Sequence, residues 1–198
     1  MILEHSGHCR DCKEQVRRLL AALYGGCRVN HSFPWPAKVQ DYEQTVIGDT
    51  LEKIHSALGA LRGYRDFTKS AQVPPCDYYI PAPPFIVEFD ESQHFSRPRG
   101  VSLKLYPAEF RVGFPLSRWR ELCLEIGAED NDPPDRDERR AWYDALRDLV
   151  PTVHGFYPTV RLYAGEFAWC SLDRASAKDR EVFCAILKDR LPDVSSSK

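Results

Sequence analysis

The sequence contains no long apolar run. A membrane-spanning helix needs roughly 18 or more consecutive apolar residues, and no window of this 198-residue chain approaches that length. The chain also lacks a strong net charge, because 27 basic and 29 acidic residues leave a net charge of −2. Its apolar share of 43% and charged share of 28% are ordinary, which excludes a disordered chain and a collagen-like fibre. These features predict a globular protein that neither spans a membrane nor binds nucleic acid through bulk charge.

The first residues, MILEHSGHCRDC, lack the basic-then-apolar order of a secretory signal. The seven cysteines are too few for a disulfide-dense mini-protein, and their number is odd. Both points favour a reducing compartment, in which cysteines are core fillers, metal ligands or catalysts. We therefore expect a cytoplasmic protein.

Three cysteines and a histidine near the start form a metal-ligand pattern. The spacing is Cys9-x2-Cys12-x14-Cys27-x3-His31, which could close a tetrahedral site around Zn²⁺. His5 or His8 could replace one of these ligands, and incidental core or surface cysteines are the alternative. The pattern predicts a structural zinc site in an N-terminal helical segment, residues 1–36.

Periodicity and turn residues predict an α/β protein. Apolar residues at helical spacing predict helices, and short apolar runs between prolines predict strands. The expected helices cover 10–24, 41–62, 135–149 and about 174–191, and the expected strands cover 64–69, 76–80, 85–90 and part of 152–169. This order predicts a core domain at 37–192 with a mixed sheet flanked by helices, followed by a disordered tail at 193–198.

Charge is distributed unevenly behind the neutral total. Residues 95–120 contain six basic residues and one acid, whereas residues 121–138 contain eight acids and one basic residue. The basic stretch could contact an acidic partner, or the two stretches could neutralise each other.

Three carboxylates surround the two best-defined strands. Glu88 and Asp90 are two residues apart in FIVEFD and therefore point to the same face. If CDYYI pairs with this strand as a hairpin, Asp77 lies beside them. Three carboxylates at one sheet edge suit Mg²⁺, although solvated acids at strand ends are the alternative.

The string FIVEFDESQHF, with DYYIP before it, resembles the PD-(D/E)XK (restriction-endonuclease-like) superfamily. Within it, the chain is most similar to the branch of uncharacterised bacterial proteins related to very-short-patch-repair endonucleases. The residues that match this pattern are Asp77, Glu88, Asp90, Gln93 and His94, followed by Asp137, Arg140, Leu146 and the strand TVRLY. The superfamily's core order is αβββαβ, and the resemblance covers about residues 41–165. Two positions depart from it: Glu91 replaces a glycine, and Asp90 stands where the wider superfamily has a lysine.

The resemblance implies a DNA endonuclease that depends on Mg²⁺ or Mn²⁺. Asp77 and Glu88 would hold the metal, and Asp90 would support it or hold a second ion. Gln93 and His94 would position water or phosphate, unless His94 makes only a structural hydrogen bond. The basic residues Arg97, Arg99 and Lys104 would contact the DNA backbone. The alternatives are a non-catalytic nucleic-acid-binding or protein-interaction module with the nuclease fold, and a zinc-stabilised adaptor. A homodimer is left open.

Overall fold

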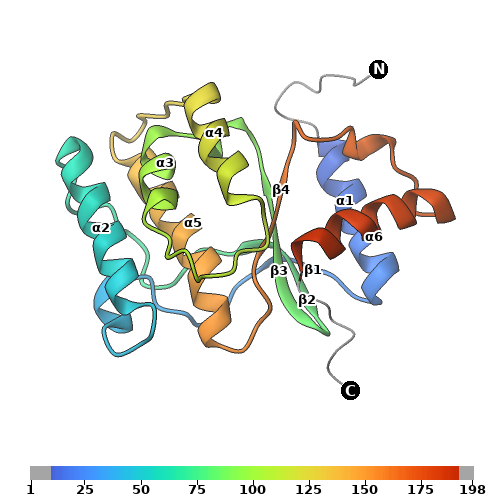
Figure 1. Cartoon of the computed structure of the whole chain (residues 1–198), viewed down its shortest axis with the longest axis horizontal. Coiled ribbons are helices and arrows are strands. Elements are labelled where there is room, and N and C mark those ends of the chain that lie inside the picture. Colours follow the sequence, from blue (N-terminus) through green and yellow to red (C-terminus); the bar gives the residue numbers. More distant parts are fainter. Residues whose placement is uncertain (1–9, 192–198) are drawn as a thin grey trace.

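The computed structural model describes residues 10–191, which form one mixed four-stranded sheet with helices on both faces (Figure 1). The strands are β1 (Arg28–His31), β2 (Cys76–Pro81), β3 (Pro84–Asp90) and β4 (Val160–Tyr163). Their order in the sheet is β1-β2-β3-β4; the first two pairings are antiparallel and the third is parallel. Within residues 10–191, none of the helices has both the length and the apolar character of a transmembrane span.

Two groups of helices cover the sheet. The first face is covered by α1 (Arg10–Tyr24) and α6 (Ala177–Arg190), and the second by α2 (Gly48–Arg62), α3 (Arg97–Lys104), α4 (Leu116–Ile126) and α5 (Arg136–Val153). Short 3-10 helices occur at η1 (Val39–Tyr42), η2 (Ser92–His94) and η3 (Trp169–Ser171).

Strand β3 is buried on both faces because it lies inside the sheet. Phe85, Val87 and Phe89 pack into the apolar cluster under α1 and α6. The alternate residues Glu88 and Asp90 face α4 and α5, which confirms that they share one side of the strand. The side chains of β3 therefore divide between an apolar face and a polar face.

The predicted α/β class is confirmed, and several boundaries hold. Helix α1 has the predicted limits, β2 and β3 match the predicted strands to within one residue, and α6 lies inside the predicted last helix. The predicted helix at 41–62 begins only at Gly48 and ends before Gly63, whose φ of 83° is left-handed. The prediction for 135–149 is too short, because α5 continues through Pro151 to Val153.

Four elements depart from the prediction. Residues 64–69 form no strand, and the outer strand is instead β1, in a segment expected to be an extended connector. Helices α3 and α4 have no counterpart in the prediction. Helix α3 has only eight residues, includes Pro98 and Gly100, and begins after a Ser96 side chain that accepts a hydrogen bond from Arg99 N. A short helix without an apolar stripe gives little periodic signal.

The described part of the predicted N-terminal segment is joined to the core. Val29 and His31 of β1 pair with Tyr78 and Cys76 of β2, and the apolar side of α1 belongs to the same cluster as β3. The predicted tail at 193–198, and also His5, His8 and Cys9, lie outside the described residues.

Candidate functional site

Asp77 and Glu88 lie on neighbouring strands at the point where β2 and β3 stop pairing residue by residue. The last regular pair before this point is Tyr78 with Val87. Beyond it, Phe89 N donates to Asp77 Oδ2 at 2.9 Å, and Asp77 N donates to Glu88 Oε1 at 3.3 Å. Each carboxylate thus uses one oxygen to replace a backbone acceptor. We call Asp77 and Glu88 the strand fork.

Helix α1 brings a lysine to the strand fork. Lys13 Nζ lies 3.6 Å from Asp77 Oδ1 and 4.0 Å from Glu91 Oε2. The Tyr78 hydroxyl donates to Lys13 O at 2.8 Å and holds this turn of α1 against β2. The side chains of Lys13 and Asp77 are 36% and 27% exposed, so this ion pair is open to water.

Asp90 does not join the strand fork. One of its oxygens accepts a hydrogen bond from Trp119 Nε1 at 2.7 Å, and the other contacts Arg161 Nη1 at 2.6 Å. Asp90 is 1% exposed. Within residues 10–191 no group of three acids, histidines or cysteines is placed to hold a metal ion. The predicted three-carboxylate Mg²⁺ site is therefore corrected, because buried partners already occupy both oxygens of Asp90.

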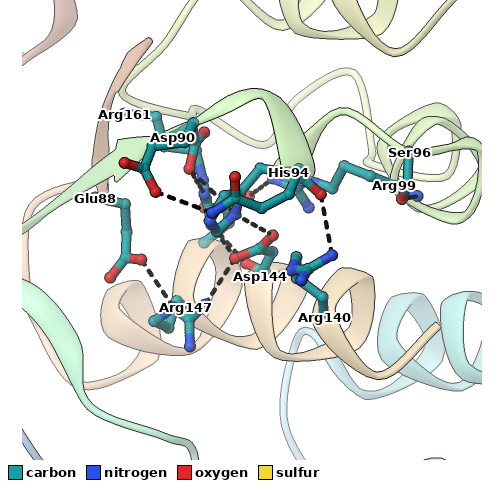
Figure 2. Close-up of polar contacts among 12 residues, drawn as sticks. Glu88, Asp90, His94, Ser96, Arg99, Arg140, Asp144, Arg147 and Arg161 are labelled. Carbon is teal, nitrogen blue, oxygen red and sulfur yellow. Dashed lines mark hydrogen bonds and ion pairs between the residues drawn. The ribbon is translucent and has the colours of Figure 1, made fainter. Parts of the chain in front are cut away.

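Asp90 instead belongs to a buried ion cluster on the second face of the sheet (Figure 2). Arg161 is at its centre: Nε contacts Asp148 at 2.6 Å, and Nη2 contacts Asp144 at 3.3 Å. Arg147 lies between Asp144, at 2.7 Å, and Glu88, at 3.1 Å. The cluster comprises Glu88, Asp90, His94, Arg99, Asp144, Arg147, Asp148 and Arg161.

His94 is part of this cluster. Its Nδ1 lies 3.1 Å from Asp144 Oδ2 and 3.6 Å from Asp90 Oδ1. Burial opposes the charged imidazole, but Asp144 and Asp90 outweigh burial and raise the pKa of His94. His94 thus contacts two acids of the cluster, Asp144 and Asp90, and these acids favour its charged form. The water- or phosphate-positioning role that the resemblance implies stays a prediction.

Glu88 connects the buried ion cluster with the strand fork. Burial raises the pKa of Glu88 to about 7; Arg147 acts against this shift, and Asp77 adds to it. Arg147 Nε is buried and has no hydrogen-bond partner among the described residues. Its contact with Glu88 Oε2 is therefore ionic and poorly aligned, although the two atoms are 3.1 Å apart.

Gln93 is held in place beside this region. Its Nε2 donates to Glu91 Oε2 at 2.9 Å, and its backbone oxygen accepts from Arg140 Nη1 at 3.1 Å. The same Arg140 atom contacts Asp137 Oδ1 at 3.1 Å. Three positions of the resemblance, Gln93, Asp137 and Arg140, thus come together in space.

The predicted DNA-binding residues separate into two groups. Arg97 and Lys104 are exposed, as a backbone contact requires. Arg99 is 1% exposed and contacts Asp148 at 2.6 Å, so its predicted role is corrected to a structural one. The neutralisation alternative has support from one residue: within the described residues, Arg118 of the basic stretch pairs with Glu121 and Glu125. The other ion pairs of the acidic stretch are with Arg62, Arg136 and Arg140, which lie outside the basic stretch.

The described residues do not assemble the predicted zinc site. Cys12 is 1% exposed in the apolar cluster of the first face, on the helical stripe with Val16 and Leu19. His31 stacks on Tyr79, with ring centroids 4.9 Å apart, against the cluster of the second face. Burial raises the pKa of Cys27 to about 11, which disfavours the thiolate that zinc requires. These three ligands are thus core or sheet residues, and Cys9 lies outside the described residues.

By the chemistry of its donors, the strand fork suits a divalent cation bound by two carboxylates. Asp77 and Glu88 each use one oxygen for a backbone amide, and their second oxygens make only ionic contacts with Lys13 and Arg147. Mg²⁺ is usually bound through one or two carboxylates, with water and substrate phosphate completing its coordination. The donor set at the strand fork is therefore sufficient in number and type without Asp90.

No family model, curated protein or solved structure matches this chain. The family resemblance therefore stays a prediction based on the motif residues and on the geometry described above.

Sequence reasoning did not identify the cations that face the predicted acids. Lys13 follows Asp11 and Cys12 on a surface helix, and nothing local marks it. A signal was available for α5, where Asp144, Arg147 and Asp148 are spaced i, i+3 and i+4 on the buried side of the helix. Charged residues at core spacing indicate a buried ion network.

Proposed function

We propose that this chain is a divalent-metal-dependent DNA endonuclease with a restriction-endonuclease-like fold. The observation that supports this proposal best is the strand fork, where Asp77 and Glu88 on adjacent strands each bind a backbone amide of the other strand, and Lys13 lies beside Asp77. The element order α1-β1-β2-β3-α5-β4 supports this fold, since it reads αβββαβ when α2 to α4 are treated as insertions. Lys13 supplies from α1 the cation that the motif lacks at Asp90.

Asp77 and Glu88 would hold Mg²⁺ or Mn²⁺. When bound, such a metal activates a water molecule and stabilises a leaving oxygen on phosphorus. Lys13 would donate to a non-bridging phosphate oxygen, where negative charge increases during phosphoryl transfer. Asp90 would act indirectly, because Arg161 and Trp119 fix it and thereby fix the end of β3.

A plasmid-nicking assay in Mg²⁺ tests this function. Asp77→Asn and Glu88→Gln should each reduce nicking by more than the roughly 10–100-fold typical of changes outside the ligand shell. Asp66→Asn is a matched control, because Asp66 is an exposed acid that contacts only Lys69 among the described residues. Full nicking by Glu88→Gln would refute the proposal.

A second candidate function is supported by the ion pairs themselves. Arg147 and Lys13 already neutralise Glu88 and Asp77 without a metal, as in a nuclease fold that binds nucleic acid but no longer cleaves it. Salt-dependent DNA binding without nicking in Mg²⁺ or Mn²⁺ would support this reading over the enzyme.

A further inference from the structure

A pocket between α1 and the β1–β2 edge opens onto the strand fork. It has a volume of about 360 Å³, and its lining includes Lys13, Glu14, Arg17, Asn30 and Asp77. Because Asp77 belongs to both features and Lys13 contacts it, the pocket gives solvent access to the proposed metal ligand Asp77. We call it the α1 pocket.

In the α1 pocket, the Glu14 carboxylate binds the Arg17 guanidinium in the geometry in which a phosphate would bind it. Arg17 Nε donates to Glu14 Oε2 and Arg17 Nη2 donates to Glu14 Oε1, each at 2.7 Å, so the contact is bidentate. Arg18 Nε also contacts Glu14, at 2.8 Å. Hydrogen bonds from Arg17 and Arg18 lower the pKa of Glu14 to about 2. Arg17 is therefore oriented for a planar or tetrahedral anion by an internal carboxylate.

A strained residue lies on the opposite wall of the α1 pocket. Asn30 has a φ of 50°, the one positive φ outside glycine among residues 10–191. It is exposed at the end of the outer strand and lines the pocket. Unusual backbone conformations at pocket walls are frequently retained for binding, and its carboxamide can both donate and accept.

We propose that the α1 pocket binds a phosphate of the DNA strand next to the bond that is cut, with Arg17 exchanging Glu14 for that phosphate. This proposal rests on the proposed function, because it extends the same site. The lining carries two cations, Lys13 and Arg17, and two carboxylates, Glu14 and Asp77. A phosphate therefore gains net attraction only when one carboxylate is neutralised. A divalent cation at Asp77 does this and also releases Lys13, so metal and phosphate binding reinforce each other.

The test measures binding of a fluorescein-labelled DNA oligonucleotide by anisotropy, in EDTA and in Ca²⁺. Wild type should bind more tightly in Ca²⁺. Arg17→Gln should weaken binding about tenfold, the loss of one charge-assisted contact, and should reduce the salt slope by about one. Arg18→Gln is the matched control, since Arg18 shares the partner Glu14 but does not line the pocket; its affinity should change less than Arg17→Gln.

Glu14→Gln should change DNA affinity in the opposite direction. It releases Arg17 and should tighten DNA binding, mainly in EDTA, and Arg17→Gln in the same chain should cancel this gain. Equal affinities for Arg17→Gln and Arg18→Gln, or no tightening by Glu14→Gln, would overturn the proposal. An absence of DNA binding by wild type would overturn it as well.

The assay separates this inference from the proposed function because it requires no cleavage. Arg17-dependent binding without nicking in Mg²⁺ would support the α1 pocket and reject catalysis. Nicking that requires Asp77 but is indifferent to Arg17 would support catalysis and reject the α1 pocket.

Discussion

The strand fork and the buried ion cluster both contain acids of the β2–β3 hairpin, but the acids Asp77 and Asp90 have opposite environments in the two regions. Asp90 is 1% exposed and is fixed by Arg161 and Trp119. Asp77 has a 27% exposed side chain and meets Lys13 at 3.6 Å. A guanidinium with several buried partners cannot leave its acids, because the charges would be stranded in a dry interior. A half-exposed lysine can exchange its acid for water, a metal or a phosphate at little cost.

This contrast distinguishes a structural acid from an acid available for chemistry within one sequence motif. Asp90 of FIVEFD pairs with the buried Arg161, whereas Asp77 of DYYIP pairs with the half-exposed Lys13. Glu88 belongs to both regions, since its two oxygens face Asp77 N and Arg147.

Removing Arg161 should have the largest effect on this comparison. Arg161→Met leaves Asp90, Asp144 and Asp148 without their shared buried cation, and breaking a buried pair costs about 3–5 kcal/mol. Urea unfolding should show that loss, or no folded protein. Arg118→Ala is the control; its two acid partners are on the surface, so its loss should be about 0–1 kcal/mol. Equal losses for the two variants would contradict the structural role of the buried ion cluster.

Stability should fall as pH rises from about 4.5 to 7. Folding raises the pKa of Glu88 from 4.5 to about 7, so in this range the folded state holds a proton that the unfolded state releases. His94 acts in the same direction: its raised pKa gives stability that is complete below its ordinary value of 6.5 and is lost as pH rises through the folded value. We expect a decrease on the order of 1–3 kcal/mol.

Urea unfolding across this pH range measures the decrease. Glu88→Gln should flatten the profile between about pH 4.5 and 7, whereas the exposed control Glu109→Gln should leave it unchanged. A stability that rises with pH through this window would show that Glu88 is ionised in the fold.

The sequence predicted strands β2 and β3 better than the outer strand β1 that pairs with β2. The apolar run of FIVEF and the flanking prolines define β2 and β3, and alternation correctly placed Glu88 and Asp90 on one face. Outer strand β1 was missed because it has four residues among aromatic and proline residues, and its place depends on pairing with a segment about fifty positions later.

The acids of the site were predictable, but their environment was not. Asp90 meets Arg161 across 71 positions, and Lys13 reaches Asp77 from a helix that no local pattern connects to β2. The same limitation explains the predicted zinc site. Cys-x2-Cys gives metal-like spacing, but Cys12 also continues the apolar stripe of α1, and packing against the sheet determines its position. Burial and long-range pairing decide such cases, and a single sequence shows neither.

Removing Lys13 should have the smallest effect on stability, and it tests the exposed side of the comparison between Asp77 and Asp90. Lys13→Met removes a cation from Asp77 just as Arg161→Met removes one from Asp90, but the pair is 36% and 27% exposed. Water can replace the lysine, so the free energy of unfolding should change by less than about 1 kcal/mol. The methionine also removes the cation–π contact of Lys13 Nζ with Phe89, whose ring centroid lies 5.9 Å away, but such a contact at an exposed site contributes only about 0.5–1 kcal/mol. Urea unfolding beside Arg161→Met measures the difference directly. A loss comparable to that of Arg161→Met would mean that Lys13 is locked in place as firmly as the buried arginine, and the strand fork could not then release it to a metal or a phosphate.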